Sequence, residues 1–317
     1  MRADARLLVT AARNGRALAC DVDATAFILA HPRGAYTAAR TVAQTRIFDY
    51  DAHVQRLVDS TLAMQAAKGR SLEPRAVADA LRPRTEATLR AAMNAFRRQF
   101  EAEPAQEFKV TVLVCPREDA TQSVSEKELL ESSDVYCHIG LLPPLRSGTV
   151  KLLVAGLPRQ NAAAKDSAWV RERKAIYDAI PKDVEEVILM DPSTHALLEG
   201  SQTNFYAIRG GTVYTADDGI LKGTVRSLVL EVCAASGIPV ELTPPSLDQV
   251  EEWEGCFISS TSRLVLGAGS IEYDDPPTMQ RRTRSFPANA ALEHIISSVR
   301  SSVLRKSTIV FDDGASG

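Results

Sequence analysis

A glutamate stands between two apolar stretches in the segment LLEGSQTNFYAI, residues 197–208. Apolar flanks of this kind are typical of strands inside a sheet, so the chain is expected to carry Glu199 towards a core. An ionised carboxylate in a core must be hydrogen-bonded, paired with a cation or used in chemistry, because an unpartnered buried charge is very costly. The plainer alternative is that Glu199 is an exposed strand residue.

Three other segments carry groups that bind phosphate. The segment KGTVRS, residues 222–227, places backbone N–H groups at a predicted helix start, where the helix dipole favours an anion. The segment SSTS, residues 259–262, supplies hydroxyl and backbone donors. Arg56, in HVQRL, lies on a predicted helix and can bind two phosphate oxygens at once. Taken singly, a solvated arginine and a turn of hydroxyl residues are the ordinary alternatives.

A lysine adds a nucleophile to these groups. The segment AKDSAWVRER places Lys165 at the start of a predicted helical segment. A lysine amine can form a Schiff base with an aldehyde, and an acid such as Glu199 can keep a heterocyclic nitrogen protonated. Phosphate, aldehyde and pyridine nitrogen occur together in one cofactor, pyridoxal phosphate. Judged by spacing alone, an exposed loop lysine is the alternative for Lys165.

Hydrophobic periodicity divides the chain that must position these residues into two parts. The segment PPLRSGTVKLLVAGLPRQNAAAK is the best candidate for the connection, so a second unit should begin near residue 150. The first part is α+β, with a strand at 35–48, a helix at 51–67, two helices within 73–100 separated around Pro83, and strands at 108–117 and 134–144. The second part has a helix at 168–180, an antiparallel meander of strands at 184–191, 196–208 and 211–216, a helix within 220–237, and a strand at 256–269 interrupted by hydroxyl residues.

Composition excludes several classes of protein. The chain has 317 residues, of which 45% are hydrophobic and 24% charged, which is typical of a folded protein of two domains or one large one. A net charge of −3 gives no general attraction for nucleic acid or an anionic membrane. The five cysteines are scattered without paired spacing, which argues against a disulfide framework and a zinc site, so no metal is expected. A cytoplasmic location is predicted, with organelle targeting by the arginine-containing amino terminus as the alternative.

The motifs, in their order along the chain, resemble those of the fold-type IV pyridoxal-phosphate enzymes. This family comprises branched-chain aminotransferases, D-amino acid aminotransferases and aminodeoxychorismate lyases. The similarity covers roughly residues 34–275, and its specific part is the E-G-x-x-x-N motif followed by I-L-x-G-x-x-R. It implies an α+β fold like that of D-amino acid aminotransferase, with a smaller N-terminal α/β sandwich, residues 1–149, and a larger C-terminal domain with a β-barrel-like core, residues 150–317. The larger domain would carry the Schiff-base lysine, and the protein would form a homodimer.

The resemblance also implies a role for each candidate residue. Lys165 would form the Schiff base with pyridoxal 5'-phosphate, and Glu199 would bind the pyridine nitrogen. The other implied cofactor contacts are Arg56, the backbone N–H groups of Thr224 and Val225, and a hydroxyl of Ser260 or Thr261 at the phosphate, Leu221 on one face of the ring, and Asn204, which closes the glutamate motif.

The chain departs from the family pattern in two segments. Branched-chain members carry an Asn-Tyr pair shortly after the lysine, whereas this chain has Ala168, Trp169 and Val170 there. Arg159 could replace the tyrosine at the cofactor's phenolic oxygen, or it could be a surface residue near a turn. Tyr36 resembles a substrate-pocket tyrosine of the D-amino acid enzymes, although a strand tyrosine is equally a good core residue. The segment ISSTSRLVLGAG also departs, with Arg263 and Leu264 where a glutamate is common and Gly267 where a proline is.

The resemblance predicts an aminotransferase that acts on an amino acid and a 2-oxo acid, of the branched-chain or D-amino acid type. The alternatives are a carbon–oxygen lyase of the aminodeoxychorismate lyase type, or a non-catalytic relative that binds a phosphate ligand.

Overall fold

A computed structural model describes residues 7–101, 103, 105–116 and 126–311. The chain forms two compact units. The first comprises residues 1–144, 164–172 and 306–317, and the second comprises residues 145–163 and 173–305.

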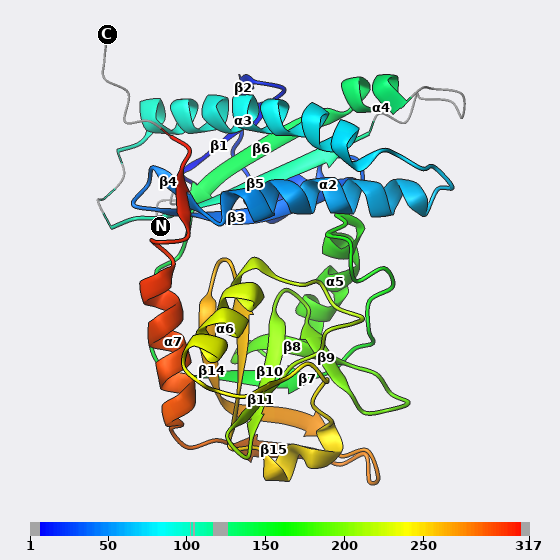
Figure 1. Cartoon of the computed structure of the whole chain (residues 1–317), viewed down its shortest axis with the longest axis vertical. Helices are drawn as coiled ribbons and strands as arrows, with labels where there is room; N and C mark the ends of the chain where they lie inside the picture. Colours follow the sequence, from blue (N-terminus) through cyan, green and yellow to red (C-terminus); the bar gives the residue numbers. More distant parts are fainter. Residues whose placement is uncertain (1–6, 102, 104, 117–125, 312–317) are drawn as a thin grey trace, which may run out of the picture. The chain divides into compact units, whose positions relative to one another are not determined.

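The first unit is built on one sheet with helices on its faces. The sheet has the strand order β16-β4-β3-β5-β6-β1-β2. Helices α2 and α3 pack on one face (Figure 1), and the shorter α1 packs on the other. The elements are β1 (Val9–Arg13), β2 (Arg16–Leu18), α1 (Ala24–Leu29), β3 (Ala35–Val42), β4 (Arg46–Phe48), α2 (Tyr50–Ala66), α3 (Pro74–Gln99), β5 (Phe108–Cys115), α4 (Glu126–Ser132), β6 (Asp134–Leu141) and β16 (Ser307–Ile309).

Helix α3 differs from the prediction, which was wrong to divide it at Pro83. The helix is continuous from Pro74 to Gln99, with Pro83 inside it. A proline inside a helix removes one backbone hydrogen bond and costs about 3 kcal/mol. Residues on both sides of the proline, Leu81 and Leu89 among them, are buried in the same hydrophobic core. Packing of the whole apolar face therefore outweighs the local preference for a break.

The predicted strand at 35–48 is a hairpin instead. Residues 43–45 form the turn between β3 and β4, with positive φ at Ala43 and Gln44, and the two strands pair antiparallel. The turn carries no Gly or Pro, so its sequence gave no signal of a break.

The second unit contains a closed barrel. Strands β10, β13, β14, β7, β8 and β9 follow one another in hydrogen-bonded order, and β9 pairs back onto β10 through Glu199 and Asn204. The elements of this unit are β7 (Val150–Val154), most of α5 (Ala168–Ala179), β8 (Val184–Met190), β9 (Leu197–Gly200), β10 (Asn204–Arg209), β11 (Thr212–Tyr214), α6 (Thr224–Ala235), β12 (Val240–Glu241), the 3-10 helix η1 (Leu247–Glu252), β13 (Gly255–Ser260), β14 (Leu264–Asp274), β15 (Arg281–Ser285) and α7 (Ala290–Ser302).

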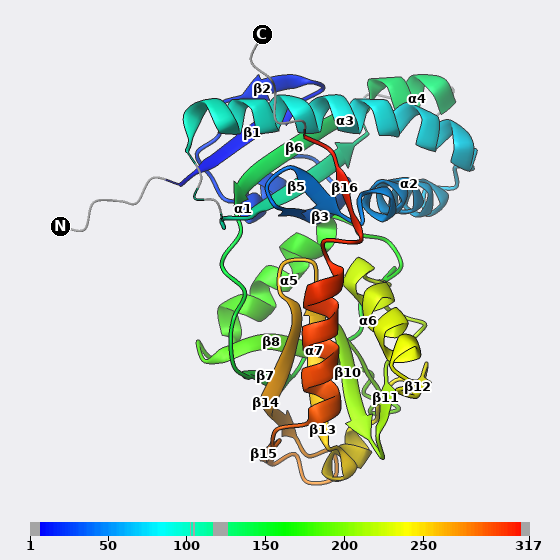
Figure 2. The ribbon, with the colours of Figure 1, turned by 60° about the vertical axis from the view of Figure 1, so that its left-hand side comes forward.

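Two tight turns in the barrel replace single predicted strands. Residues 201–203 separate β9 from β10, and residues 261–263 separate β13 from β14. The predicted helix beginning near Gly223 is confirmed as α6. Helices α6 and α7 lie side by side against β13 and β14 (Figure 2).

The predicted fold class is confirmed: the protein is α+β, with a barrel in its second unit. Residues 164–172 and 306–317 belong to the first unit. The backbone of this first segment hydrogen-bonds to β3, and β16 pairs with β4. Among the described residues, no helix has the length and apolar character needed to cross a membrane.

The barrel core predicts a stability effect. Leu152 on β7 is 0% exposed and packs in the barrel core. We expect Leu152→Ala to lower the free energy of unfolding by about 2–5 kcal/mol, because it removes buried contacts and leaves a cavity. Leu157 is 66% exposed, so Leu157→Ala is the matched control. Urea unfolding measures both, and equal effects of the two substitutions would contradict this description of the core.

Candidate active site

Glu199 is buried at the end of β9 and paired with a cation. Its side chain is 5% exposed, and the Nε of Arg159, whose own side chain is 7% exposed, donates to Glu199 Oε1 at 2.7 Å. The backbone N–H of Leu221 donates to Oε2 at 3.0 Å. The exposed-strand interpretation of Glu199 and the surface interpretation of Arg159 are therefore both wrong. Burial of both partners makes this ion pair far less screened by solvent than a surface pair.

Asn204 fixes the loop that supplies the second hydrogen bond to Glu199. Its Nδ2 donates to the Leu221 carbonyl at 2.8 Å, and its Oδ1 accepts from the Gly223 N–H at 3.1 Å. A Cβ at position 223 would lie 2.4 Å from Asn204 Oδ1, so this contact requires glycine. The E-G-x-x-x-N motif thus places an acid and an amide on paired strands, and both hold residues 221–223.

The start of α6 lies directly after this loop. Gly223 is the N-cap and makes no side-chain capping bond, while Thr224 and Val225 are buried first-turn residues. Thr224 Oγ1 and Thr261 Oγ1 lie 3.2 Å apart, which brings the hydroxyl loop to the helix start. Ser260 Oγ accepts from the Arg263 N–H at 3.3 Å. Backbone donors, the helix dipole and hydroxyls at one place form a suitable environment for a phosphate.

On the first unit, two hydrogen bonds hold the main chain of Lys165. Its carbonyl accepts from the Tyr36 N–H at 2.9 Å, and its N–H donates to Ser60 Oγ at 3.0 Å. The Lys165 ammonium lies 4.8 Å from the centre of the Tyr36 ring, within the range of a cation–π interaction. Tyr36 is buried in a core cluster with Ala11 and Phe27. The helix begins at Ala168 rather than at the lysine.

Contacts that flank the lysine were not foreseen from the sequence. Asp166 is buried and accepts from Arg33, with the Arg33 Nε at 3.1 and 2.9 Å from its two carboxylate oxygens. The Ser167 N–H donates to the Gly34 carbonyl at 2.9 Å, and the Gly34 N–H donates to Ser167 Oγ at 2.9 Å. The partners in these contacts are more than 130 residues apart in sequence. The signal available in the sequence was Asp166, an acid next to Lys165 that needs a cation if it is buried.

Arg56 lies on α2 in the first unit. It is half-buried, and loss of hydration lowers the pKa of its guanidinium to about 10, although Asp49 and Asp59 oppose that change. A poorly hydrated cation gains from binding an anion such as a phosphate. One helical turn earlier, His53 is buried with its Nδ1 2.7 Å from Thr37 Oγ1. Burial, with smaller contributions from Arg56 and Lys165, holds the pKa of His53 well below its usual range.

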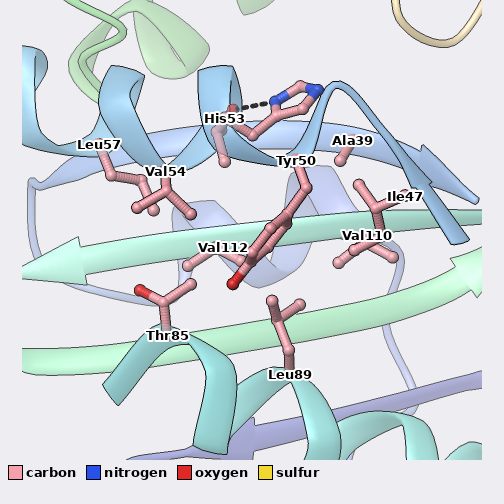
Figure 3. Close-up of a pocket in the computed structure, with 11 residues that line it drawn as sticks. Ala39, Ile47, Tyr50, His53, Val54, Leu57, Thr85, Leu89, Val110 and Val112 are labelled. Atoms are coloured by element: carbon pink, nitrogen blue, oxygen red, sulfur yellow. Dashed lines mark hydrogen bonds between the residues drawn. The ribbon is translucent and has the colours of Figure 1, made fainter. Parts of the chain in front are cut away.

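Figure 3 shows the small cavity beside His53, which lies among α2, α3 and the sheet. Its volume is about 10 Å³, room for roughly one water molecule. Tyr50 and Thr85 line it, and their hydroxyls have no hydrogen-bond partner among the described residues. The cavity is far too small for a cofactor, so it belongs to the core of the first unit.

The candidate residues fall into two groups, one on each unit. The structure brings together one group on the first unit (Tyr36, Arg56 and Lys165) and one on the second (Arg159, Glu199, Asn204, Leu221, Thr224, Val225, Ser260 and Thr261). Taken unit by unit, the donor set fits pyridoxal phosphate. The second unit supplies a buried carboxylate for a protonated ring nitrogen and a helix start for a phosphate, and the first supplies an amine and a cation.

Comparison with known proteins gives a consistent result. The family model described as amino-transferase class IV matches residues 34–271. A probable branched-chain-amino-acid aminotransferase of Rickettsia felis is 24% identical over 170 residues, which cover 44% of this chain and 58% of the relative. The chain spans about half the length of the curated Rickettsia relatives it matches.

Solved structures share the fold. The branched-chain aminotransferase of Thermoproteus uzoniensis with norvaline has a TM-score of 0.67 at 18% identity, covering 95% of this chain and 99% of its own. A hypothetical aminotransferase of Mycobacterium tuberculosis in its PLP-bound form has a TM-score of 0.68 at 17% identity, covering 93% and 99%.

The buried ion pair generates a stability prediction. We expect Arg159→Met to lower the free energy of unfolding by about 3–5 kcal/mol, because it leaves the Glu199 carboxylate buried without the arginine. The double variant Arg159→Met/Glu199→Gln should recover most of this loss, since the charge is gone as well. Urea unfolding of the chain without cofactor measures both.

The control for this prediction is the more exposed pair of Arg209 and Glu252, where the glutamate side chain is 62% exposed. Arg209→Met should cost no more than about 1 kcal/mol. An Arg159→Met effect as small as that would refute the importance of burial.

His53 generates a pH prediction. Its pKa in the folded protein lies below the unfolded value, so the unfolded chain binds a proton that the folded chain rejects. The contribution of His53 is therefore fully present above about pH 6.5 and is lost as the pH falls below it, by at most about 1.4 kcal/mol per pH unit. In urea unfolding at pH 7 and pH 5, His53→Gln should reduce the acid loss of stability. The same substitution at the exposed His294 should not, and equal curves for the two variants would refute the assignment.

Proposed function

Because the chain belongs to the class IV aminotransferases, we propose that it is a pyridoxal-phosphate-dependent enzyme that transfers an amino group from an amino acid to a 2-oxo acid. The observation that carries this proposal is the buried Glu199, held by Arg159 and the Leu221 amide in the loop that Asn204 braces. A buried carboxylate can accept a hydrogen bond from a protonated pyridine nitrogen, which favours that protonated form.

Bound pyridoxal phosphate supplies an aldehyde for an amine and a ring that accepts the electron pair left when a Cα proton is removed. The chain supplies the groups around it. Glu199 has two carboxylate oxygens, each able to accept more than one hydrogen bond, so the bonds from Arg159 and Leu221 leave acceptor capacity for a ring N–H. Leu221 itself is half-buried and is proposed to pack on one face of the ring.

Lys165 is proposed to be the catalytic residue. With pyridoxal phosphate bound, Lys165 would hold the cofactor aldehyde through its side-chain amine, and this amine would carry the proton to and from the substrate Cα. The backbone bonds to Tyr36 and Ser60 fix where the lysine stem begins, and the Tyr36 ring lies under the side-chain nitrogen, with its centre 4.8 Å away. We assign Tyr36 this supporting role, together with the expected place beside the substrate.

Each unit offers groups that suit a phosphate. The helix start at Thr224 and Val225 offers backbone N–H groups, and Ser260 or Thr261 offers a hydroxyl. Arg56 offers a guanidinium whose loss of hydration an anion would offset.

Arg159 is the proposed substitute for the tyrosine that is missing after Lys165. Its Nε is committed to Glu199, and its Nη2 donates to the Ala162 carbonyl at 2.9 Å. These bonds favour a primary role in holding the Glu199 side chain in place, with the contact to the phenolic oxygen as a second role.

The names of the relatives support a branched-chain amino acid and its 2-oxo acid as substrates. Nothing in the site favours a lyase. We further propose a homodimer located in the cytoplasm, with no nucleic acid or membrane as partner.

The test uses the full chain loaded with pyridoxal phosphate. We expect a visible absorption band, and covalent attachment of the cofactor to the peptide containing Lys165 after borohydride reduction. Lys165→Ala should show neither and should lose activity by about 10³-fold or more. Lys174→Ala, at an exposed lysine of α5, is the control that should behave as wild type.

Substrate assays complete this test. L-leucine, L-valine and D-alanine with 2-oxoglutarate should give glutamate from the branched-chain donors. Release of pyruvate from aminodeoxychorismate without an amino acceptor would identify a lyase instead. Cofactor binding without any reaction on amino acids would identify a non-catalytic relative.

A further inference from the structure

A second carboxylate of the barrel, Glu186 on β8, has no place in the mechanism above. Counted over the whole residue, Glu186 is 0% exposed and Glu199 is 4% exposed, so Glu186 is the more deeply buried of the two. A charged group buried to this degree is retained only where hydrogen bonds and a cation compensate its lost hydration.

One oxygen of Glu186 collects three donors. Its Oε1 accepts from the Tyr177 hydroxyl at 3.0 Å, from Ser201 Oγ at 2.7 Å and from the Val187 N–H at 2.9 Å. The Gln202 Nε2 donates to the Tyr177 hydroxyl at 2.6 Å. Burial raises the pKa of Tyr177, followed by the charge of Glu186, so the phenol keeps its proton as a donor. Two residues of the 201–203 turn are therefore hydrogen-bonded to this carboxylate, Ser201 directly and Gln202 through the Tyr177 hydroxyl.

The other oxygen of Glu186 faces a cation. Its Oε2 has no hydrogen-bond partner among the described residues, and Arg263 Nη1 lies 4.0 Å from it. The Arg263 Nε donates to Glu185 Oε1 at 2.8 Å, and its backbone N–H donates to Ser260 Oγ. Adjacent glutamates on β8 thus hold the arginine that follows the hydroxyl residues.

The turn packs tightly against Glu186. A Cβ at Gly200 would lie 2.9 Å from Glu186 Cγ and 2.1 Å from Thr203 Oγ1, so only glycine permits this approach. Backbone bonds complete the fit, because the Ser201 N–H donates to the Val187 carbonyl at 2.9 Å. The turn joins Glu199 to Asn204, the two motif residues that hold the loop before α6.

We propose that Glu186 is a positioning residue that holds two cofactor-binding loops of the second unit, residues 201–203 and 260–263, from one buried carboxylate. The first loop sets Glu199 and Asn204, and the second sets the hydroxyls of Ser260 and Thr261. Arg263, which departs from the family pattern, is the cation of this network. The proposal rests on the proposed function for the meaning of the loops, but the network itself can be tested without cofactor.

The experiment measures backbone amide hydrogen exchange in the full chain freed of cofactor. Glu186→Gln keeps the shape and removes the charge that faces Arg263, and Tyr177→Phe removes one donor to Oε1 only. The matched control is Tyr273→Phe, which deletes a phenol donor to Glu251, 3.3 Å away, elsewhere on the barrel.

We expect Glu186→Gln to speed exchange about tenfold or more in peptides covering 199–204 and 259–264. Tyr177→Phe should speed exchange only in 199–204, because it does not touch Arg263. The dissociation constant for pyridoxal phosphate, measured by quenching of intrinsic fluorescence, should rise about tenfold in Glu186→Gln, which is about 1.4 kcal/mol. Tyr273→Phe should change neither readout.

The outcomes separate the two proposals. A lower melting temperature for Glu186→Gln with unchanged loop exchange and cofactor affinity would assign Glu186 a purely structural role and overturn the inference. Faster exchange in one loop only would overturn the joint anchoring. If Glu186→Gln does not fold, Tyr177→Phe tests the first loop and Arg263→Met, which removes the cation facing Glu186, tests peptide 259–264; unchanged exchange in either, relative to Tyr273→Phe, would overturn the joint anchoring. If wild-type protein binds no pyridoxal phosphate, the proposed function fails while the exchange data still test the network.

Discussion

The second unit is organised around the cost of burying a carboxylate. Glu199 is buried on a strand of a closed barrel, with only 5% of its side chain exposed, so its charge must be met by protein groups. The Arg159 guanidinium and the backbone N–H of Leu221 each donate a hydrogen bond to the carboxylate. Each of these must in turn be held in place, and Asn204 does this for the loop containing Leu221. The shape of the site follows from this sequence of requirements.

Barrel closure makes those requirements achievable. Glu199 and Asn204 are the pair through which β9 meets β10, so the two motif residues close the ring of strands. Their spacing is therefore fixed by the backbone ladder and not by side-chain packing alone. The turn between them is short and carries Gly200, because the Glu186 side chain lies against it. Fold and site here are specified by the same residues.

Much of this could be predicted from the sequence, where the signal was local. Apolar flanks indicated that Glu199 lay on a strand in a core, and Gly223 before an apolar helix indicated the start of α6. Both signals depend on neighbours within a few residues. The partner of Glu199 was not predictable in this way, because Arg159 lies 40 residues earlier and only the folded barrel brings them together. The prediction of a break at Pro83 failed for the same reason, because the packing that stabilises the continuous α3 comes from other elements.

The main-chain attachment of Lys165 has a consequence for the life cycle of the protein. Tyr36 and Ser60 hold the lysine backbone through bonds that involve no cofactor, and Arg33 secures the next residue through Asp166. The conformational entropy of this segment is therefore lost when the chain folds, and not when the cofactor binds. A chain that has lost its cofactor keeps the lysine segment in place. A cofactor molecule that binds again therefore meets a lysine segment that is already ordered. This segment is the same in a newly made chain and in a chain that has lost its cofactor.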